Sequence, residues 1–148
     1  MSEELTQDEA DRLFRMEKKR TKVEMVRWPG LGKKVTVDLF SSDTREAFIL
    51  DVERSYIKLS KLTLQNRARV TVCLARLDID GAPHRNPDDE EIPCPHLHLF
   101  REGYNDKWAI PVPEKFFTKL SDRRKTVSEF MKYCSIIDPP VFLEDLLS

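Results

Sequence analysis

Apolar and polar residues alternate with a period of two along most of this chain, and no other feature constrains its fold as strongly. The alternating segments are residues 22–27, 35–39, 47–52, 56–59, 69–79, 96–101 and 107–112. Successive side chains of a strand point to opposite faces of a sheet, so such segments are typical of strands buried on one face. Short turn sequences predict two hairpins, one joining the first two segments and one joining the next two. We therefore expect a mostly antiparallel sheet of six or seven strands.

Helical spacing is confined to the two ends of the chain. Residues 6–20 predict a helix, because the Thr6–Glu9 pair has the spacing of a capping box. A second helix is predicted to begin at Ser121 or Asp122 and to end at Cys134, and the short apolar tail after it is expected to dock on the body. This arrangement predicts a single α+β domain over residues 1–148, with an N-terminal and a C-terminal helix.

The composition narrows the class of protein. Lys and Arg number 25 against 26 for Asp and Glu, so the chain has no overall attraction for nucleic acid, and such binding would need a local patch. No apolar run is long enough to span a membrane, and residues 1–4 do not resemble a signal peptide. Three widely spaced cysteines argue against a disulfide framework. We therefore expect a cytoplasmic protein without a membrane partner.

All three histidines lie between residues 84 and 98. On a strand, His96 and His98 project to the same face, and His84 enters from the adjoining loop. Histidines serve as bases, acids and metal ligands. Two of them in register with a third nearby favour a functional group over decoration of a solvated sheet face.

One use of this group is metal binding. Cys94, His96 and His98 stand at i, i+2 and i+4, so an extended backbone would aim all three at one point, with His84 as a fourth zinc ligand. Two prolines flank Cys94, however, and a buried, unreactive cysteine is the commoner outcome. The run His96, His98 and Glu102 also resembles half of a cupin metal motif. The flanking glycines of that motif are missing, which argues against a jelly roll.

The other use is cleavage of RNA without a metal. His96 and His98 would act as the base that removes the 2′-OH proton and the acid that protonates the leaving oxygen. Asp78 would hold one histidine tautomer through a hydrogen bond. His84 would orient the substrate or bind its phosphate.

Cations and an aromatic ring near the histidines are predicted to bind the RNA. The candidate cations are Arg69, Arg76, Arg85, Arg101 and Lys107. We expect Arg76 or Lys107 to offset the charge that develops on the phosphorus, and Arg101 to add to binding. Tyr104 can stack on a base.

The histidine-rich region also carries a family resemblance. It reads Arg-Leu-Asp-Ile-Asp-Gly-Ala-Pro-His-Arg-Asn-Pro-Asp at residues 76–88, Ile-Pro-Cys-Pro-His-Leu-His at 92–98 and Glu-Gly-Tyr-Asn-Asp-Lys-Trp-Ala at 102–109. These motifs resemble an uncharacterised family of small bacterial and prophage proteins over nearly the whole chain. More distantly, the order of Arg76, Asp78, His84, His96 and His98 resembles that in TumE-like toxins of toxin–antitoxin modules. That resemblance implies an activity on RNA, although the acidic insert at residues 88–91 and the terminal helix depart from it.

The sequence therefore predicts a toxin-like, metal-independent endoribonuclease that needs no cofactor and has RNA and a cognate antitoxin as partners. A first alternative is a non-enzymatic phage or prophage factor that binds a protein through the acidic loop at residues 88–91 and the strand face. A second alternative is a small zinc-binding protein that uses Cys94, His96 and His98. A test of metal content separates the zinc alternative from the others.

Overall fold

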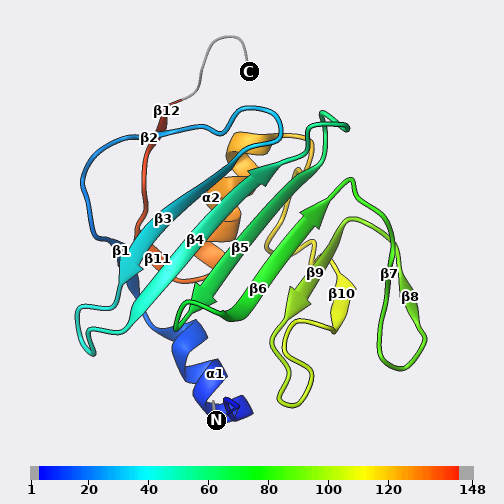
Figure 1. Cartoon of the computed structure of the whole chain (residues 1–148), viewed down its shortest axis with the longest axis horizontal. Coiled ribbons are helices and arrows are strands. Elements are labelled where there is room, and N and C mark those ends of the chain that lie inside the picture. The colour runs from blue at the N-terminus through cyan, green and yellow to red at the C-terminus, as the bar shows by residue number, and fades with distance from the viewer. Residues whose placement is uncertain (1–3, 144–148) are drawn as a thin grey trace.

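The computed structural model describes residues 4–143, and within them eight strands form one sheet in the order β10-β9-β6-β5-β4-β3-β1-β11 (Figure 1). The strands of this sheet are β1 (Lys18–Arg20), β3 (Lys34–Phe40), β4 (Ala47–Arg54), β5 (Leu62–Ala68), β6 (Val72–Ile79), β9 (His96–Leu99), β10 (Ala109–Pro111) and β11 (Ile136–Asp138). Among these described strands, neighbours are antiparallel except for β1 and β11, which are parallel. The prediction of an α+β fold with a mostly antiparallel sheet is confirmed.

The remaining elements lie at the margins of this sheet. They are the helices α1 (Gln7–Arg15) and α2 (Arg123–Tyr133) and the short pairs β2 (Val26–Arg27) with β12 (Phe142–Leu143) and β7 (His84–Arg85) with β8 (Glu91–Ile92). Figure 1 shows α2 behind the large sheet and α1 at its lower edge. In the part of the chain that the structure describes, no helix is long and apolar enough to cross a membrane.

One face of the sheet forms the core. Val52, Leu64, Leu77 and Leu97 pair with one another across β4, β5, β6 and β9, and all four are fully buried. They belong to the same apolar cluster as Phe130 of α2. Burial of a large aliphatic side chain contributes about 1.5–3 kcal/mol, so this row holds the central strands against the helix.

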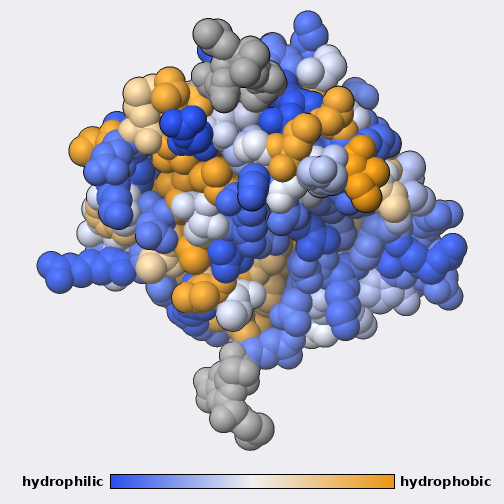
Figure 2. Space-filling model, turned by 45° about the horizontal axis from the view of Figure 1, so that its top comes forward, coloured by the Kyte–Doolittle hydropathy of each residue, from blue (hydrophilic) through white to orange (hydrophobic). Residues whose placement is uncertain are grey.

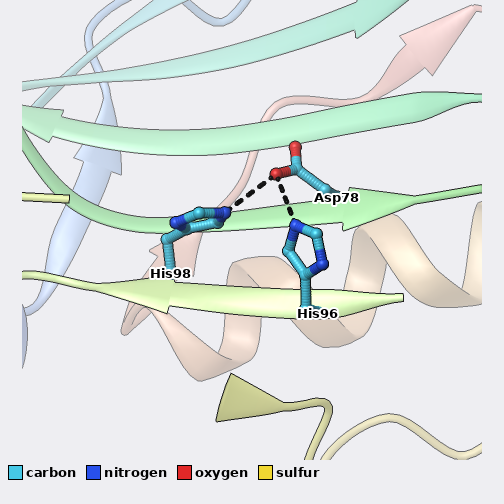
Figure 3. Close-up of side chains that lie close together, drawn as sticks. All are labelled: Asp78, His96 and His98. Atoms are coloured by element: carbon cyan, nitrogen blue, oxygen red, sulfur yellow. Dashed lines mark hydrogen bonds and ion pairs between the residues drawn. The ribbon is translucent and has the colours of Figure 1, made fainter. Parts of the chain in front are cut away.

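The opposite face of the same strands is polar. Because side chains alternate along a strand, each residue next to a buried leucine points away from α2. Two neighbouring rows result: Lys34, Glu53, Thr63, Asp78 and His96 in one, and Thr36, Asp51, Gln65, Arg76 and His98 in the other. Figure 3 shows side chains of this face in front of the strands, with α2 behind them. Polar side chains from five strands, with ionisable groups on four of them, are thereby brought onto one surface.

The two predicted helices differ in how well the sequence places them. The second is confirmed, because Asp122 caps α2 and Cys134 ends it. The first has its predicted capping box, but the prediction that it extends to residue 20 is wrong, since α1 ends at Arg15. Residues 18–20 instead form β1 and pair with β3 and β11, a tertiary contact that local charge pattern does not reveal.

The predicted hairpin of residues 22–27 with 35–39 is wrong. β2 pairs with β12 near the C-terminal end, whereas β3 pairs with β1 and β4. Val23 and Met25, which suggested a strand by their alternation, are exposed. Across the described residues, no neighbouring surface buries these two side chains, so their alternation does not produce the predicted strand.

The predicted strand at residues 56–59 is also wrong. Tyr56 and Ile57 are 79% and 92% exposed in the loop that follows β4. Besides β3, the strand that pairs with β4 is β5, which was not predicted from the sequence. Its buried face includes Asn66, and this polar residue hides the alternation that the other buried residues of β5 follow.

The later segments follow the prediction more closely. β6 begins at Val72 rather than residue 69, because Arg69 and Val70 adopt positive φ angles in a turn. β9 and β10 form the predicted antiparallel pair. The predicted loop before β9 contains the small β7–β8 hairpin, and the tail after α2 docks through β11 and β12.

Candidate functional site

His96 and His98 lie side by side on β9 and both face Asp78 on the adjacent strand β6 (Figure 3). The Nε2 atom of each imidazole is 3.2 Å from the same oxygen, Oδ2 of Asp78. The alternation of β9 puts both rings on the polar face, as the sequence predicts, and the register of β6 with β9 brings the carboxylate opposite them. Two imidazoles and one carboxylate therefore converge on a point.

These side chains line a pocket of about 400 Å³ on the polar face. The pocket is lined by Lys34, Asp51, Glu53, Lys61, Thr63, Gln65, Arg76, Asp78, Gly81, Ala82, Pro83, His84, His96 and His98. Only 3% of His96 and 1% of His98 is exposed, whereas His84 is half-buried. The two strand histidines thus form the floor of the pocket, and His84 is the more accessible of the three rings.

Arg76 connects the histidines to two carboxylates. Its Nε donates to Oδ2 of Asp78 at 3.3 Å, and its Nη1 donates to Asp106 at 2.8 Å. Its Nη2 lies 3.2 Å from Nε2 of His98, so it can donate to that ring nitrogen as well. The guanidinium is thereby held in one orientation beside the imidazoles.

The turn between β9 and β10 fixes the orientation of two rings through its backbone. The carbonyl of Asp106 lies 2.8 Å from Nδ1 of His98, and the carbonyl of Lys107 lies 2.7 Å from Nε2 of His84. A carbonyl oxygen only accepts hydrogen bonds, so the ring nitrogen in each pair carries a proton. The ring centroids of His84 and His98 are 4.6 Å apart.

The electrostatics of the cluster favour an ionised carboxylate. Burial by itself would raise the pKa of Asp78, but the close contact with the His98 imidazole and the charge of Arg76 outweigh burial and lower that pKa to about 2. Burial also lowers the pKa of His96, because it disfavours the charged imidazolium. The pair therefore consists of an anionic Asp78 and an imidazole held toward its neutral form.

Several predicted residues lie apart from this pocket. The guanidinium of Arg101 stacks over the ring of Trp108 at 4.1 Å, and Tyr104 packs edge-on against the same indole. Lys107 contributes its backbone carbonyl to His84. Arg101, Tyr104 and Lys107 do not belong to the described residues that line the pocket. The pocket therefore does not bring their side chains to the histidines.

Cys94 is likewise turned away from the histidines. Its thiol donates to the carbonyl of Asp78 and accepts from the amide of Gly81. Within residues 4–143, the group of nearby ligand atoms consists of Asp78, His96 and His98, without Cys94 or His84. The third member of the ligand group is therefore the carboxylate of Asp78, and not the thiolate of Cys94 that the sequence predicts.

The sequence did not predict the polar residues that other strands add to the pocket. Lys34, Asp51 and Gln65 reach it from β3, β4 and β5. Asp51 is buried and accepts two hydrogen bonds from Arg67, which fix its position. The alternation of β4 places Asp51 on the polar face, but only the register across four strands shows that it lies near the histidines.

Comparisons with known proteins identify a family without identifying an activity. No curated protein and no solved structure gives a significant match. Residues 5–136, which cover most of the chain and the whole histidine cluster, match a family model. The chain therefore belongs to the family of unknown function DUF6978.

Proposed function

We propose that the histidine-lined pocket is the active site of an endoribonuclease. The observation that carries this proposal is the convergence of three imidazoles, Asp78 and Arg76 from three separate segments on one pocket. Groups that move protons and a fixed cation are what phosphodiester cleavage requires. RNA is the substrate that the resemblance to TumE-like toxins implies.

The contacts favour His84 as the group that moves the proton. Its Nε2 donates to the carbonyl of Lys107, which leaves Nδ1 to exchange a proton with the substrate. In His98, Nδ1 faces the Asp106 carbonyl, while Nε2 faces Arg76 and Asp78. In His96, Nε2 faces Asp78 and Nδ1 is buried. This proposal differs from the expectation from the sequence, in which His96 and His98 are the acid–base pair and His84 orients the substrate or binds its phosphate.

A single imidazole is sufficient for the proton transfer. His84 would take the proton of the attacking 2′-hydroxyl and deliver it to the oxygen of the leaving strand as the phosphorus–oxygen bond breaks. Arg76 and the pocket lysines Lys34 and Lys61 would hold the phosphate and offset its charge. In this scheme the strand histidines anchor the site rather than exchange protons.

The test is cleavage of labelled RNA by the purified protein, with an oligonucleotide of the same sequence that lacks the 2′-hydroxyl at every position. We expect RNA to be cleaved and the DNA analogue to stay intact. His84→Ala should lower the cleavage rate by about 10²-fold. Lys107→Ala is the matched control, because it keeps the carbonyl that His84 contacts and should keep the activity. Equal cleavage by wild type and His84→Ala would refute the assignment, as would no cleavage across a panel of RNAs.

A second candidate function, binding to a protein partner, is favoured by an exposed apolar loop. Tyr56, Ile57 and Leu59 are all exposed in the segment between β4 and β5. Figure 2 shows apolar patches on an otherwise hydrophilic surface, and exposed apolar groups in one loop are typical of contact sites. Co-purification with the product of the adjacent gene tests this candidate. Binding that Ile57→Asp abolishes would support it, and binding unaffected by that change would exclude this loop.

A further inference from the structure

Three potential ligand atoms meet on the floor of the pocket. They come from His96, His98 and Asp78, and one ligand atom of each residue lies within 4.8 Å of the other two (Figure 3). The Nε2 atom of each histidine is 3.2 Å from Oδ2 of Asp78. Paired strands carry these residues, so the spacing of the three atoms is set by the sheet rather than by a loop.

The surrounding hydrogen bonds orient two of the ligands as metal sites require. Nδ1 of His98 donates to the carbonyl of Asp106, so a neutral ring presents the lone pair of Nε2 to the pocket. The other carboxylate oxygen of Asp78, Oδ1, accepts a hydrogen bond from Thr63. Metal-binding histidines commonly donate their second ring nitrogen to a carbonyl, and metal-binding carboxylates are commonly hydrogen-bonded in turn.

Arg76 occupies the acceptors of this cluster in the present structure. Its donors reach Oδ2 of Asp78 and Nε2 of His98, the same two atoms that a cation would use. Its third contact, to Asp106, lies outside the ligand group and would hold the guanidinium nearby after displacement. A metal ion would therefore compete with Arg76 for two ligands.

The charges that line the pocket indicate what a bound metal ion would contribute. The lining contains three cations, Lys34, Lys61 and Arg76, and three carboxylates, Asp51, Glu53 and Asp78. These charges cancel, so the carboxylates of the lining offset the lysines and Arg76 that would hold the phosphate, and the pocket has no excess of positive charge of its own. A divalent ion on the floor would supply that excess at the place where the phosphate would sit.

We propose that Asp78, His96 and His98 bind one divalent first-row metal ion, with Zn²⁺ as the best match. Two imidazole nitrogens, one carboxylate oxygen and an open fourth position are typical of catalytic zinc sites, and non-haem Fe²⁺ uses the same donor set. The proposal that an ion binds rests on the geometry of these three side chains alone. Its use as the group that polarises the phosphate rests on the proposed function.

The test measures metal binding without any nucleic acid. The full chain, prepared without a histidine tag and treated with a chelator, is titrated with Zn²⁺ against a chromophoric chelator. We expect one Zn²⁺ ion to bind per chain. Co²⁺ bound in place of Zn²⁺ should give absorption bands in the visible range, as expected for a metal site of low symmetry. Asp78→Asn and His98→Gln should each weaken Zn²⁺ binding by about 100-fold or more, with circular dichroism confirming that both variants are folded.

Two control variants test which side chains are the metal ligands. His84→Ala and Cys94→Ser should retain Zn²⁺ binding, because neither side chain belongs to the ligand group of the described residues. No stoichiometric binding, or binding unchanged in both Asp78→Asn and His98→Gln, would overturn the metal site. Loss of binding in His84→Ala or Cys94→Ser would overturn this choice of ligands. Zinc binding without RNA cleavage would refute the proposed function and leave the metal site standing.

Discussion

The side-chain amide of Asn86 makes two hydrogen bonds to the backbone of Ala109. Its Nδ2 donates to the carbonyl at 2.9 Å, and its Oδ1 accepts from the amide at 2.8 Å. Asn86 follows β7 directly and is buried, so it attaches the β7–β8 hairpin to β10 as a further strand residue would. His84 lies two residues earlier and contacts the Lys107 carbonyl itself, so the Asn86 hydrogen bonds are a second attachment that holds this hairpin at the pocket.

We expect Asn86→Ala to destabilise the protein by about 1–3 kcal/mol, because a buried amide and carbonyl at Ala109 lose their partners. The free energy of unfolding in urea measures this effect. RNA cleavage should fall together with it, since the hairpin that carries His84 loses this attachment. Glu91→Ala, an exposed change on the same hairpin, is the control and should be neutral. Equal stability of Asn86→Ala and wild type would show that the hairpin is held by other contacts.

Replacement of Arg76 separates its two expected roles. In Arg76→Met the guanidinium no longer competes for Asp78 and His98, so Zn²⁺ should bind about tenfold more tightly, in line with removal of a like charge at short range. RNA cleavage should decrease, because the cation beside the phosphate is lost. The control is Arg85→Met, since Arg85 is exposed and donates to the carbonyl of Asp89. Weaker zinc binding in Arg76→Met would contradict the competition.

Asp51 is expected to make stability depend on acid pH. Burial alone would raise its pKa, but the hydrogen bonds from Arg67 and Thr36 outweigh burial, so the pKa lies below its ordinary value. A carboxyl with a lowered pKa in the folded state stabilises the fold above its unfolded pKa, about 3.9, and this contribution is lost as the pH falls through the folded pKa. The wild type should therefore lose stability on acidification more steeply than Asp51→Asn.

Urea unfolding of both proteins between pH 3 and pH 7 checks this expectation. At pH 7, Asp51→Asn should be less stable by about 3 kcal/mol, because Arg67 is left without its carboxylate. Arg69→Gln removes two ion pairs of an exposed arginine and should change stability by no more than about 0.5 kcal/mol. A constant difference between wild type and Asp51→Asn across this pH range would exclude the pKa shift.

Lys18 is expected to make stability depend on alkaline pH, again with stability rising as the pH rises. It is fully buried, and its ammonium donates to the carbonyls of Phe14, Met16 and Cys134. Burial lowers its pKa to about 8. Between pH 8 and pH 10 the unfolded chain then binds more protons than the folded one, so stability contributed by this residue rises with pH. The stability difference between wild type and Lys18→Met should therefore shift in favour of wild type over this range.

Thermal or urea unfolding at several pH values measures that shift. At pH 7, Lys18→Met should cost about 2 kcal/mol, because three carbonyls lose their donor. Lys22→Met, a change at an exposed lysine, provides the control and should show no such dependence. A difference between wild type and Lys18→Met that stays constant from pH 8 to pH 10 would mean that the buried amine keeps its ordinary pKa.

The local pattern of the chain was sufficient to predict the class of fold and the face of the histidines. The alternation of β9 places His96 and His98 together, and the caps of α2 are readable from Asp122 and Cys134. These features depend only on neighbours a few residues apart, through the geometry of a strand or of a helix end. A histidine-centred site could be anticipated for the same reason.

Strand pairing, by contrast, was decided by the tertiary structure. The register of β6 against β9 makes Asp78, rather than Cys94, the partner of the two imidazoles. β5 was hidden because Asn66 interrupts its apolar face, although the strand is buried between β4 and β6. Pairing joins residues far apart in the chain, and its free energy comes from burying whole faces at once. Local alternation determines which side chains share a face, and only the assembled sheet determines which strands, and therefore which ligands, lie next to one another.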